Sequence, residues 1–164
     1  MTDTVHALFA ATAARTPGAD FLCIEPVTAR AYGLAPCTLG WGDAAREVAR
    51  LRAAYAAAGY GHGHRVGLLL ENRPDFLFHW FALNALGASV VPINAELRSA
   101  ELEYLVGHSE IALAVALPER VDDLRRAAQA VGPLRGPTAL RCSAPQFAAP
   151  AARPRLCSPP APLS

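Results

Sequence analysis

The stretch from residue 65 to 94, RVGLLLENRPDFLFHWFALNALGASVVPIN, constrains the fold more than any other part of the chain. Val66–Leu70 is a continuous apolar run between a glycine-rich loop and a polar segment, which is typical of a strand covered on both faces. Pro74 suits the first turn of a helix, because the N–H that proline lacks would be unpaired there. The helix predicted over 74–86 is apolar on nearly every side and should be buried. Ser89–Ile93 then predicts a second buried strand, whose proline places its end near an edge of the sheet.

Hydrophobic periodicity predicts further elements on both sides of this unit. They are a helix over 4–15 whose apolar face holds Val5, Leu8, Phe9 and Thr12, strands over 21–24 and 38–41, an irregular segment over 26–36, a helix over 43–58, a helix over 99–108 with Ser99 as its N-cap, a strand over 111–117 and a helix over 120–131. Strands that alternate with helices imply parallel pairing with right-handed crossovers. The sequence therefore predicts an α/β fold with a partial, doubly wound parallel sheet.

Composition excludes several classes of protein. The chain has 164 residues, enough for one domain, and its net charge of +1 predicts no attraction to nucleic acid or to anionic membranes. No run approaches the roughly 18 apolar residues that span a bilayer, and the first residues lack the pattern of a secretory signal. The four cysteines are widely spaced without a C-x-x-C pair. They are interpreted as reduced thiols of a cytoplasmic protein.

Composition changes abruptly near residue 133. Eight prolines lie between residues 133 and 164, and no periodic apolar segment separates them. Proline removes ladder donors and interrupts helices, so this stretch is predicted to be a disordered tail. The sequence thus predicts a folded region over 1–132 and a Pro/Ala-rich tail over 133–164.

Three pieces of the chain, taken in order, resemble one enzyme family. They read TLGWGDAAREVARLRAAYAAAGYGHGHRVGLLL, then ENRPDFLFHWFALNALGASVVPIN, then LRSAELEYLVGHSEIALAV. The block from Trp41 to Val115 resembles the N-terminal part of the adenylate-forming, or AMP-binding, superfamily, and the NRPDF and LNALGA wording is similar to acyl-CoA synthetases. The resemblance implies the N-terminal subdomain of the adenylate-forming fold. It also implies activation of a small-molecule carboxylic acid with ATP and Mg²⁺ as an acyl-adenylate, followed by transfer to CoA.

Polyphosphate chemistry of this kind needs a loop of backbone N–H groups and hydroxyls, usually with a lysine. The resemblance implies such a Ser/Thr/Gly-rich loop and a C-terminal catalytic lysine. All 15 basic residues of this chain are arginines, and no such loop occurs in it. We therefore expect an N-terminal fragment of an AMP-forming acyl-CoA ligase that is inactive as this chain. A non-enzymatic α/β module that associates with itself or with a partner chain through the 74–86 helix, and one half of a split ligase, are the alternatives.

Few side chains qualify as site residues. Arg98 flanks the start of the helix from Ser99, where a guanidinium and the helix dipole favour a phosphate; some CoA ligases place a basic residue at this turn, so Arg98 is the candidate for the CoA phosphate. This chain has Ala95-Glu96 where many relatives have Pro-Arg, and a solvated surface arginine is the alternative. No catalytic residue and no metal ligand is expected.

The histidines and aromatic residues could belong either to a functional site or to the structural core. The histidines of the GHGH segment, His62 and His64, are interpreted as part of a glycine turn rather than a metal site. His79 is interpreted as a core histidine rather than a catalytic base. The aromatic side chains of the 74–86 helix, Phe76, Phe78, Trp80 and Phe81, are interpreted as core rather than as an acyl pocket.

The tail leads to a prediction about the coding DNA. Heavy use of Ala, Arg, Pro and Gly without lysine indicates GC-rich DNA, whose out-of-frame translation yields residues like those of the tail. A frameshift between 133 and 147 and a natural tail both explain this composition. If a frameshift occurred, translation in another frame yields a strand followed by a Ser/Thr/Gly-rich loop with lysine. If neither other frame does so, the tail is genuine.

Overall fold

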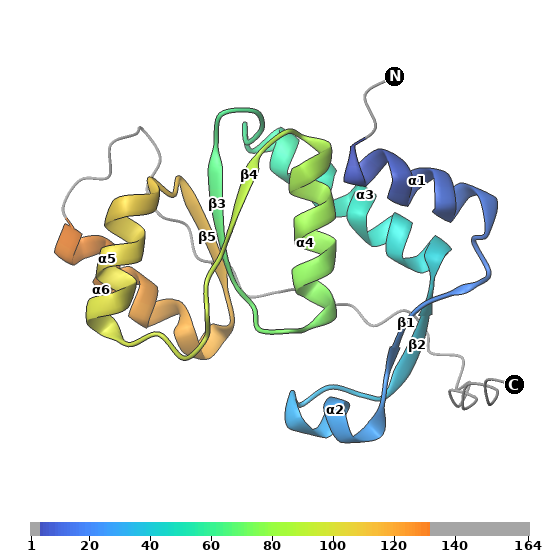
Figure 1. Cartoon of the computed structure of the whole chain (residues 1–164), viewed down its shortest axis with the longest axis horizontal. Helices are drawn as coiled ribbons and strands as arrows, with labels where there is room; N and C mark the ends of the chain where they lie inside the picture. Colours follow the sequence, from blue (N-terminus) through green and yellow to red (C-terminus); the bar gives the residue numbers. More distant parts are fainter. Residues whose placement is uncertain (1–3, 132–164) are drawn as a thin grey trace, which may run out of the picture.

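The computed structural model describes residues 4–131 (Figure 1), so the predicted tail over 133–164 lies outside the described residues. Two groups of strands are linked by helices. In chain order the elements are α1 (Val5–Arg15), β1 (Asp20–Ile24), α2 (Pro26–Ala31), β2 (Cys37–Gly40), α3 (Trp41–Ala57), β3 (Arg65–Leu69), α4 (Pro74–Ala85), β4 (Ser89–Pro92), α5 (Ser99–Ser109), β5 (Leu113–Ala116), the 3₁₀ turn η1 (Pro118–Arg120) and α6 (Val121–Val131).

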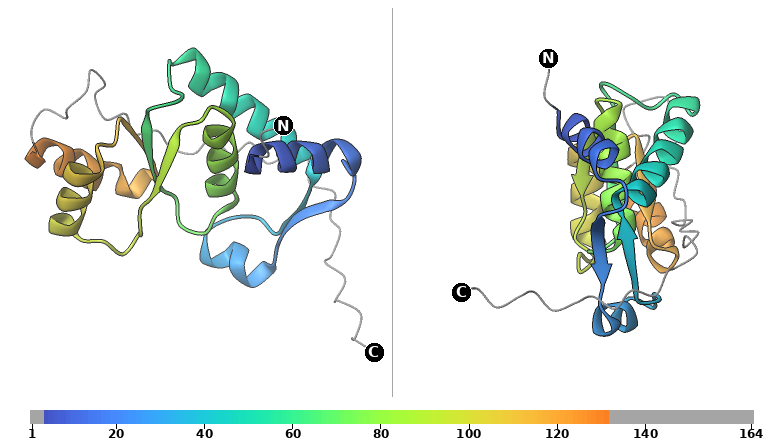
Figure 2. Two further views of the ribbon diagram at one scale, coloured as in Figure 1. Left: turned by 45° about the horizontal axis from the view of Figure 1, so that its top comes forward. Right: turned by 90° about the vertical axis from the view of Figure 1, so that its right-hand side faces the viewer.

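The larger sheet is parallel, with the strand order β4-β3-β5. Val66 of the central strand lies opposite Val90 on one side and Leu113 on the other. Helices α3 and α4 cover one face of this sheet and α5 and α6 cover the other (Figures 1 and 2). The chain therefore winds in both directions from β3, which confirms the predicted doubly wound α/β sheet.

Alternate residues of the central strand divide between two cores. Val66 and Leu68 pack with α3 and α4, whereas Leu69 packs with α5 and α6. Gly67 lies between Val66 and Leu68 in the strand. A Cβ at this position would come within 2.9 Å of the Ile93 Cδ1 atom and 3.1 Å of the Ile111 Cδ1 atom. The continuous apolar run thus has the predicted cause, because a strand covered on both faces needs apolar side chains on both.

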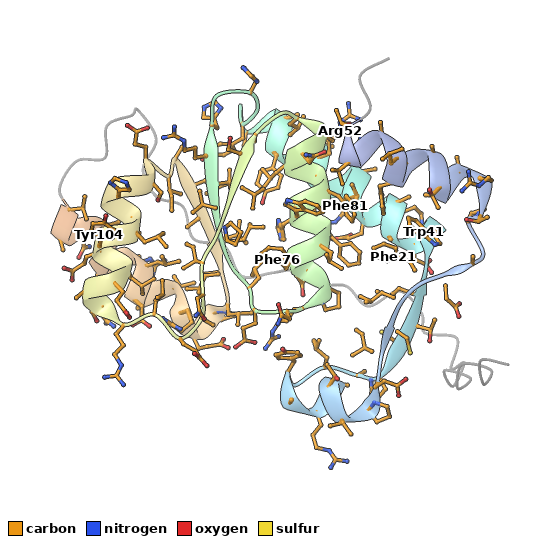
Figure 3. The ribbon with its side chains drawn as sticks, in the orientation of Figure 1. Phe21, Trp41, Arg52, Phe76, Phe81 and Tyr104 are labelled. Carbon is orange, nitrogen blue, oxygen red and sulfur yellow. The ribbon has the colours of Figure 1, made fainter. Side chains whose placement is uncertain are left out.

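A smaller antiparallel pair, β1 and β2, carries α2 at its far end (Figure 1). An aromatic cluster joins this pair to the helices. The ring of Phe9 stacks on Phe81 at 4.3 Å, and Phe21 meets Trp41 edge-on at 4.9 Å. Figure 3 shows Phe21, Trp41 and Phe81 of this cluster close together beside α4. Such contacts add to the apolar area that the rings bury.

Three local predictions are wrong. Residues 26–31, predicted to be irregular, form the short helix α2, because Pro26 occupies its first turn. In α1 the buried residues are Phe9 and Ala13, while Val5 and Leu8 of the predicted face are 44% and 61% exposed. A short helix has too few turns for periodicity to select its face, and the aromatic cluster selects it instead.

The third error concerns β4, which was predicted to be buried. Ser89 and Pro92 are exposed and the two valines between them are half-buried. Within the described residues β4 pairs with β3 alone, so it is an edge strand, as its proline predicted. An edge position removes cover from one side of a strand and lowers the burial of its side chains.

Helix α4 is covered along its whole length. No residue from Pro74 to Ala85 is exposed, and both α1 and α3 pack against this helix. This confirms the burial predicted from its apolar sequence. It also means that α4 is not a free contact surface in this structure. No helix within residues 4–131 has the length and apolar character needed to cross a membrane.

A polar pair is enclosed between α3 and α4. The hydroxyl of Tyr55 lies 2.6 Å from Nδ1 of His79, and both side chains are buried. Burial lowers the pKa of His79 to about 4, opposed by the carboxylate of Glu47 and assisted by the guanidinium of Arg50. Burial also raises the pKa of Tyr55. A neutral imidazole and a neutral phenol therefore satisfy each other in the core, as buried polar groups must.

Substituting Gly67 with valine should destabilise the fold. The added methyl groups meet the side chains of Ile93 and Ile111, and overpacking of this kind costs about 1–3 kcal/mol. Urea denaturation measures the change in the free energy of unfolding. Gly18→Ala is the control, since nothing lies within 4 Å of a Cβ at that position. Equal stability of Gly67→Val and wild type would contradict the packing described for β3.

His79 should make stability depend on pH. Folding lowers its pKa to about 4, so the unfolded chain binds more protons between that pH and 6.5. The contribution of His79 is complete above pH 6.5 and is lost as the pH falls toward 4, by about 3 kcal/mol at most. In His79→Gln this loss should vanish, whereas the exposed His108→Gln control should keep it. Parallel stability curves for wild type and His79→Gln over this range would disprove the assignment.

Candidate functional site

The carboxyl edge of the parallel sheet is the candidate ligand-binding region. In open α/β sheets ligands bind outside the carboxyl ends of the strands. Here β3 runs into Glu71 and Arg73, β4 runs into Asn94, and β5 runs into Arg120. These residues therefore share one edge of the molecule. Glu71 has a positive φ of 56°, which turns the chain sharply from β3 toward α4.

Arg98 occupies the N-cap position of α5 and is exposed. The prediction that Ser99 caps this helix is wrong, because Ser99 is already its first residue. Instead, the backbone N–H of Arg98 donates to the carboxylate of Glu101 at 2.9 Å. No ion pair of the Arg98 guanidinium is seen among residues 4–131. The side chain is therefore free to meet an anion, but Glu101 places a negative charge at the same helix end.

Helix α4 begins in a different environment. Arg73 pairs with Glu71 at 3.3 Å and lies over the ring of Tyr32, with 5.5 Å from its guanidinium carbon to the ring centre. Asp75 in the first turn is buried, and burial raises the pKa of its carboxyl, opposed by a hydrogen bond to its own backbone N–H and by Arg73. Pro74 has no N–H to offer. The start of α4 therefore presents no array of free donors to a phosphate.

Arg120 makes the most extensive polar network at this edge. Its guanidinium donates to the carbonyl of Leu97 at 2.9 Å, donates also to the carbonyl of Ala95, and pairs with Asp123 at 2.7 Å. The side chain is 20% exposed. Sequence reasoning missed this residue, because the two carbonyls that it contacts lie more than twenty positions away and nothing in the local pattern distinguishes it from a surface arginine.

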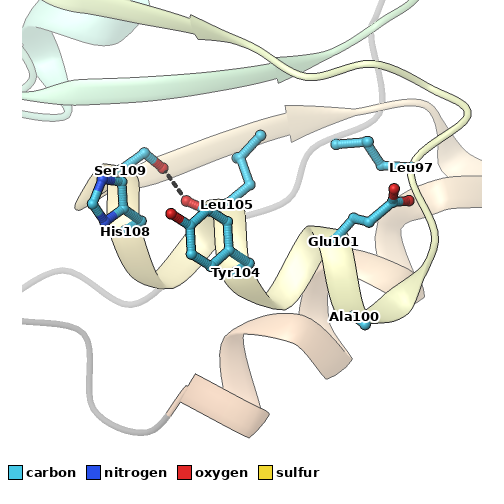
Figure 4. Close-up of a pocket in the computed structure, with 7 residues that line it drawn as sticks. All are labelled: Leu97, Ala100, Glu101, Tyr104, Leu105, His108 and Ser109. Carbon is cyan, nitrogen blue, oxygen red and sulfur yellow. Dashed lines mark hydrogen bonds between the residues drawn. The ribbon is translucent and has the colours of Figure 1, made fainter.

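Two hollows open on the surface of the described residues. One, of about 300 Å³, lies between β1, α2 and the start of α4, and includes Cys23, Tyr32, Arg73 and Phe76 in its walls. The other, of about 480 Å³, runs along the outer face of α5 (Figure 4). There the exposed ring of Tyr104 stacks on His108 at 5.4 Å, and Leu97 and Leu105 also line the hollow. Glu101 and Ser109 also line this hollow, but the Glu101 carboxylate accepts from the backbone N–H of Arg98 and the Ser109 hydroxyl donates to the carbonyl of Leu105.

The GHGH segment forms a turn. Gly63 has a positive φ of 86°, and His64 Nδ1 lies 3.2 Å from the backbone N of Gly61. The ring of His64 also meets Tyr60 edge-on at 5.6 Å. Within residues 4–131 no three His, Cys, Asp or Glu side chains form a group that could hold a metal ion. The turn interpretation matches this geometry.

The remaining sequence candidates lie in or against the core. His79 is paired with Tyr55, and Phe78 and Phe81 pack with the buried cluster around β3. Phe76 belongs partly to the 300 Å³ hollow, and Trp80 is half-buried beside Phe81 at 5.2 Å. Phe76 thus shares a hollow with Arg73 at the start of α4, whereas Phe78 and Phe81 belong to the core.

Comparison with known proteins gives one family and several similar CoA ligases. The family described as AMP-binding enzyme matches residues 9–155. The crotonobetaine/carnitine–CoA ligase of Salmonella paratyphi B is 39% identical over 69 residues, which cover 42% of this chain and 13% of that ligase. The chain therefore spans a small part of the length of the relatives that it matches.

Solved structures agree on the fold. A fatty acyl CoA synthetase of Mycobacterium tuberculosis superposes with a TM-score of 0.70 at 20% identity, over 85% of this chain and 26% of that one. The O-succinylbenzoate coenzyme A synthetase of Bacillus subtilis, in complex with AMP, superposes with a TM-score of 0.62 at 18% identity, over 75% of this chain and 29% of that one. Since the family match runs over most of the chain and these folds share its doubly wound sheet, the chain belongs to the AMP-binding enzyme family.

Proposed function

We propose that this chain is the N-terminal part of an AMP-forming acyl-CoA ligase, which activates a carboxylic acid as an acyl-adenylate and transfers it to CoA. The observation that carries the proposal is the 69-residue likeness to a CoA ligase at 39% identity. Free thiols at Cys23 and Cys37 on neighbouring strands support a cytoplasmic setting. Residues 1–132 are proposed as the ligase-like region and 133–164 as a tail, although the family match continues to residue 155.

The second part of the proposal is that these 164 residues do not carry out adenylation alone. A triphosphate needs several converging N–H donors and cations. The starts of α4 and α5 do not supply them, because Asp75 and Glu101 take up backbone donors there with their own carboxylates. The sequence contains no lysine and no Ser/Thr/Gly-rich phosphate loop. ATP and Mg²⁺ therefore do not fit the described residues.

The described residues suit a phosphate of CoA better than ATP and Mg²⁺, and they do so at Arg98. Arg98 is an exposed cation at the carboxyl edge, at the start of an eleven-residue helix, and its guanidinium is not paired within residues 4–131. We propose it as a contact for a phosphate of CoA. A guanidinium offers planar paired donors to a phosphate, and the helix dipole adds to its attraction. Glu96 and Glu101 oppose this attraction, so the expected affinity of the chain for CoA is modest.

The alternative of a non-enzymatic module that associates through residues 74–86 has less support. Its contact face would be α4, and every side chain of α4 is at least half-covered by α1, α3 and the sheet. Association through that helix would require α1 to move away. A split ligase completed by another chain stays compatible with the proposal, since it differs only in where the phosphate loop is encoded.

The purified chain should release no pyrophosphate when it is supplied with ATP, Mg²⁺, CoA and a panel of fatty and aromatic acids. The physical reason is the absence of the groups that bind polyphosphate. A full-length acyl-CoA ligase assayed in parallel provides the positive control. Acid-dependent pyrophosphate release by this chain well above background would refute the inactivity, while leaving its family assignment intact.

Arg98→Ala should weaken binding of CoA to the chain roughly tenfold, the effect of one lost charge-assisted hydrogen bond. Isothermal titration or ligand-observed NMR measures the affinity. Arg125→Ala is the matched control, because Arg125 is another exposed arginine, 60% exposed, and lies on α6 rather than at the carboxyl edge. If both variants bind CoA as the wild type does, or if the wild type binds none, Arg98 has no such role.

A further inference from the structure

We propose that Arg120 is the positioning residue for the loop between β4 and α5, and through that loop for Arg98. Only the role of Arg98 in this statement rests on the function proposed above. The clamp itself is a property of the described fold. It joins the end of β5 to the segment that follows β4, two strands that are not neighbours because β3 lies between them.

The contacts are directed at the backbone of the loop. The guanidinium of Arg120 donates to the carbonyls of Ala95 and Leu97, which lie 25 and 23 positions earlier in the chain. Its Nε donates to Asp123 at 2.7 Å, which holds the side chain in place from its own helix. Backbone carbonyls make poor targets for a merely solvated cation. Two of them on one guanidinium indicate a built contact.

The loop also has an internal turn on which the clamp acts. The side-chain oxygen of Asn94 accepts from the backbone N–H of Glu96 at 3.0 Å, and the N–H of Leu97 donates to the Asn94 carbonyl at 3.3 Å. These bonds shape the turn but do not attach it to the rest of the molecule. The side chains of Ala95 and Leu97 pack against the core between the sheet, α5 and α6, and Arg120 adds a polar attachment through their carbonyls. The residue immediately after the clamped Leu97 is Arg98.

An arginine suits this task better than a lysine. The planar guanidinium has donors in a fixed fork, so one side chain can meet two carbonyls and a carboxylate at once. A lysine in its place would keep a positive charge near Asp123, but a single ammonium on a flexible stem cannot hold the three acceptors in this geometry. Arg120→Lys therefore separates the clamp from the simple ion pair.

A second arginine provides a matched control. Arg126 pairs with the same carboxylate, Asp123, but its side chain is 66% exposed and it makes no contact with the loop among the described residues. Arg126→Ala removes a charge and an ion pair from α6 as Arg120→Ala does. Only Arg120→Ala also removes the hydrogen bonds to the carbonyls of Ala95 and Leu97.

The test is hydrogen–deuterium exchange of the full chain, read by mass spectrometry over peptides that cover residues 94–98. Arg120→Ala should speed exchange in these peptides roughly tenfold, the scale of one lost hydrogen bond to a charged group. Arg120→Lys should show most of the same increase, whereas Arg126→Ala should leave exchange there unchanged. Peptides of β3 and α4 report global stability and should exchange as in the wild type in Arg120→Lys and Arg126→Ala.

Unchanged exchange over 94–98 in both Arg120 variants would overturn the proposal, as would an equal increase in Arg126→Ala. An increase in Arg120→Lys that is uniform over the whole chain would also overturn it, because it would show a general loss of stability. The affinity for CoA gives a separate readout, which should fall in Arg120→Lys and not in Arg126→Ala. A chain that binds no CoA but shows the local exchange change would reject the role of Arg98 and retain the clamp.

Discussion

The burial of β3 on both faces is the constraint on which the rest of the structure depends. Its side chains enter two separate cores, and neither core forms without helices on its own side of the sheet. The chain must therefore cross the sheet, with α4 on one face and α5 on the other. Gly67 permits the close approach of Ile93 and Ile111 at the centre of this arrangement. A strand exposed on one face would impose no such order.

The same constraint explains how an unusually apolar helix is accommodated. The sheet covers only part of α4, and α1, α3 and the aromatic cluster around Phe9 and Phe81 cover the rest. The polar pair of Tyr55 and His79 lies inside this contact rather than at a surface. Its members are neutral and bonded to each other, so the core encloses polar atoms without leaving one unsatisfied.

Function separates from fold in this chain. The doubly wound sheet and the likeness to CoA ligases identify the family, but the described carboxyl edge holds carboxylates where a polyphosphate would need free donors. The loop at that edge is held in place by hydrogen bonds. Arg120 ties the segment after β4 to the end of β5, so the position of Arg98 is set by a contact between strands that share no ladder hydrogen bonds.

Apart from helix α2, the sequence by itself determined the succession of elements, the double burial of β3 and the family, because periodicity, proline position and short sequence motifs are local properties. It also supported the turn at GHGH and the core placement of His79. Tertiary structure alone decided which face of α1 is buried, that the valines of β4 are only half-buried, and that Arg120 clamps a loop more than twenty residues away. These outcomes depend on contacts between segments that are far apart in the chain, and local hydrophobic periodicity does not specify such contacts.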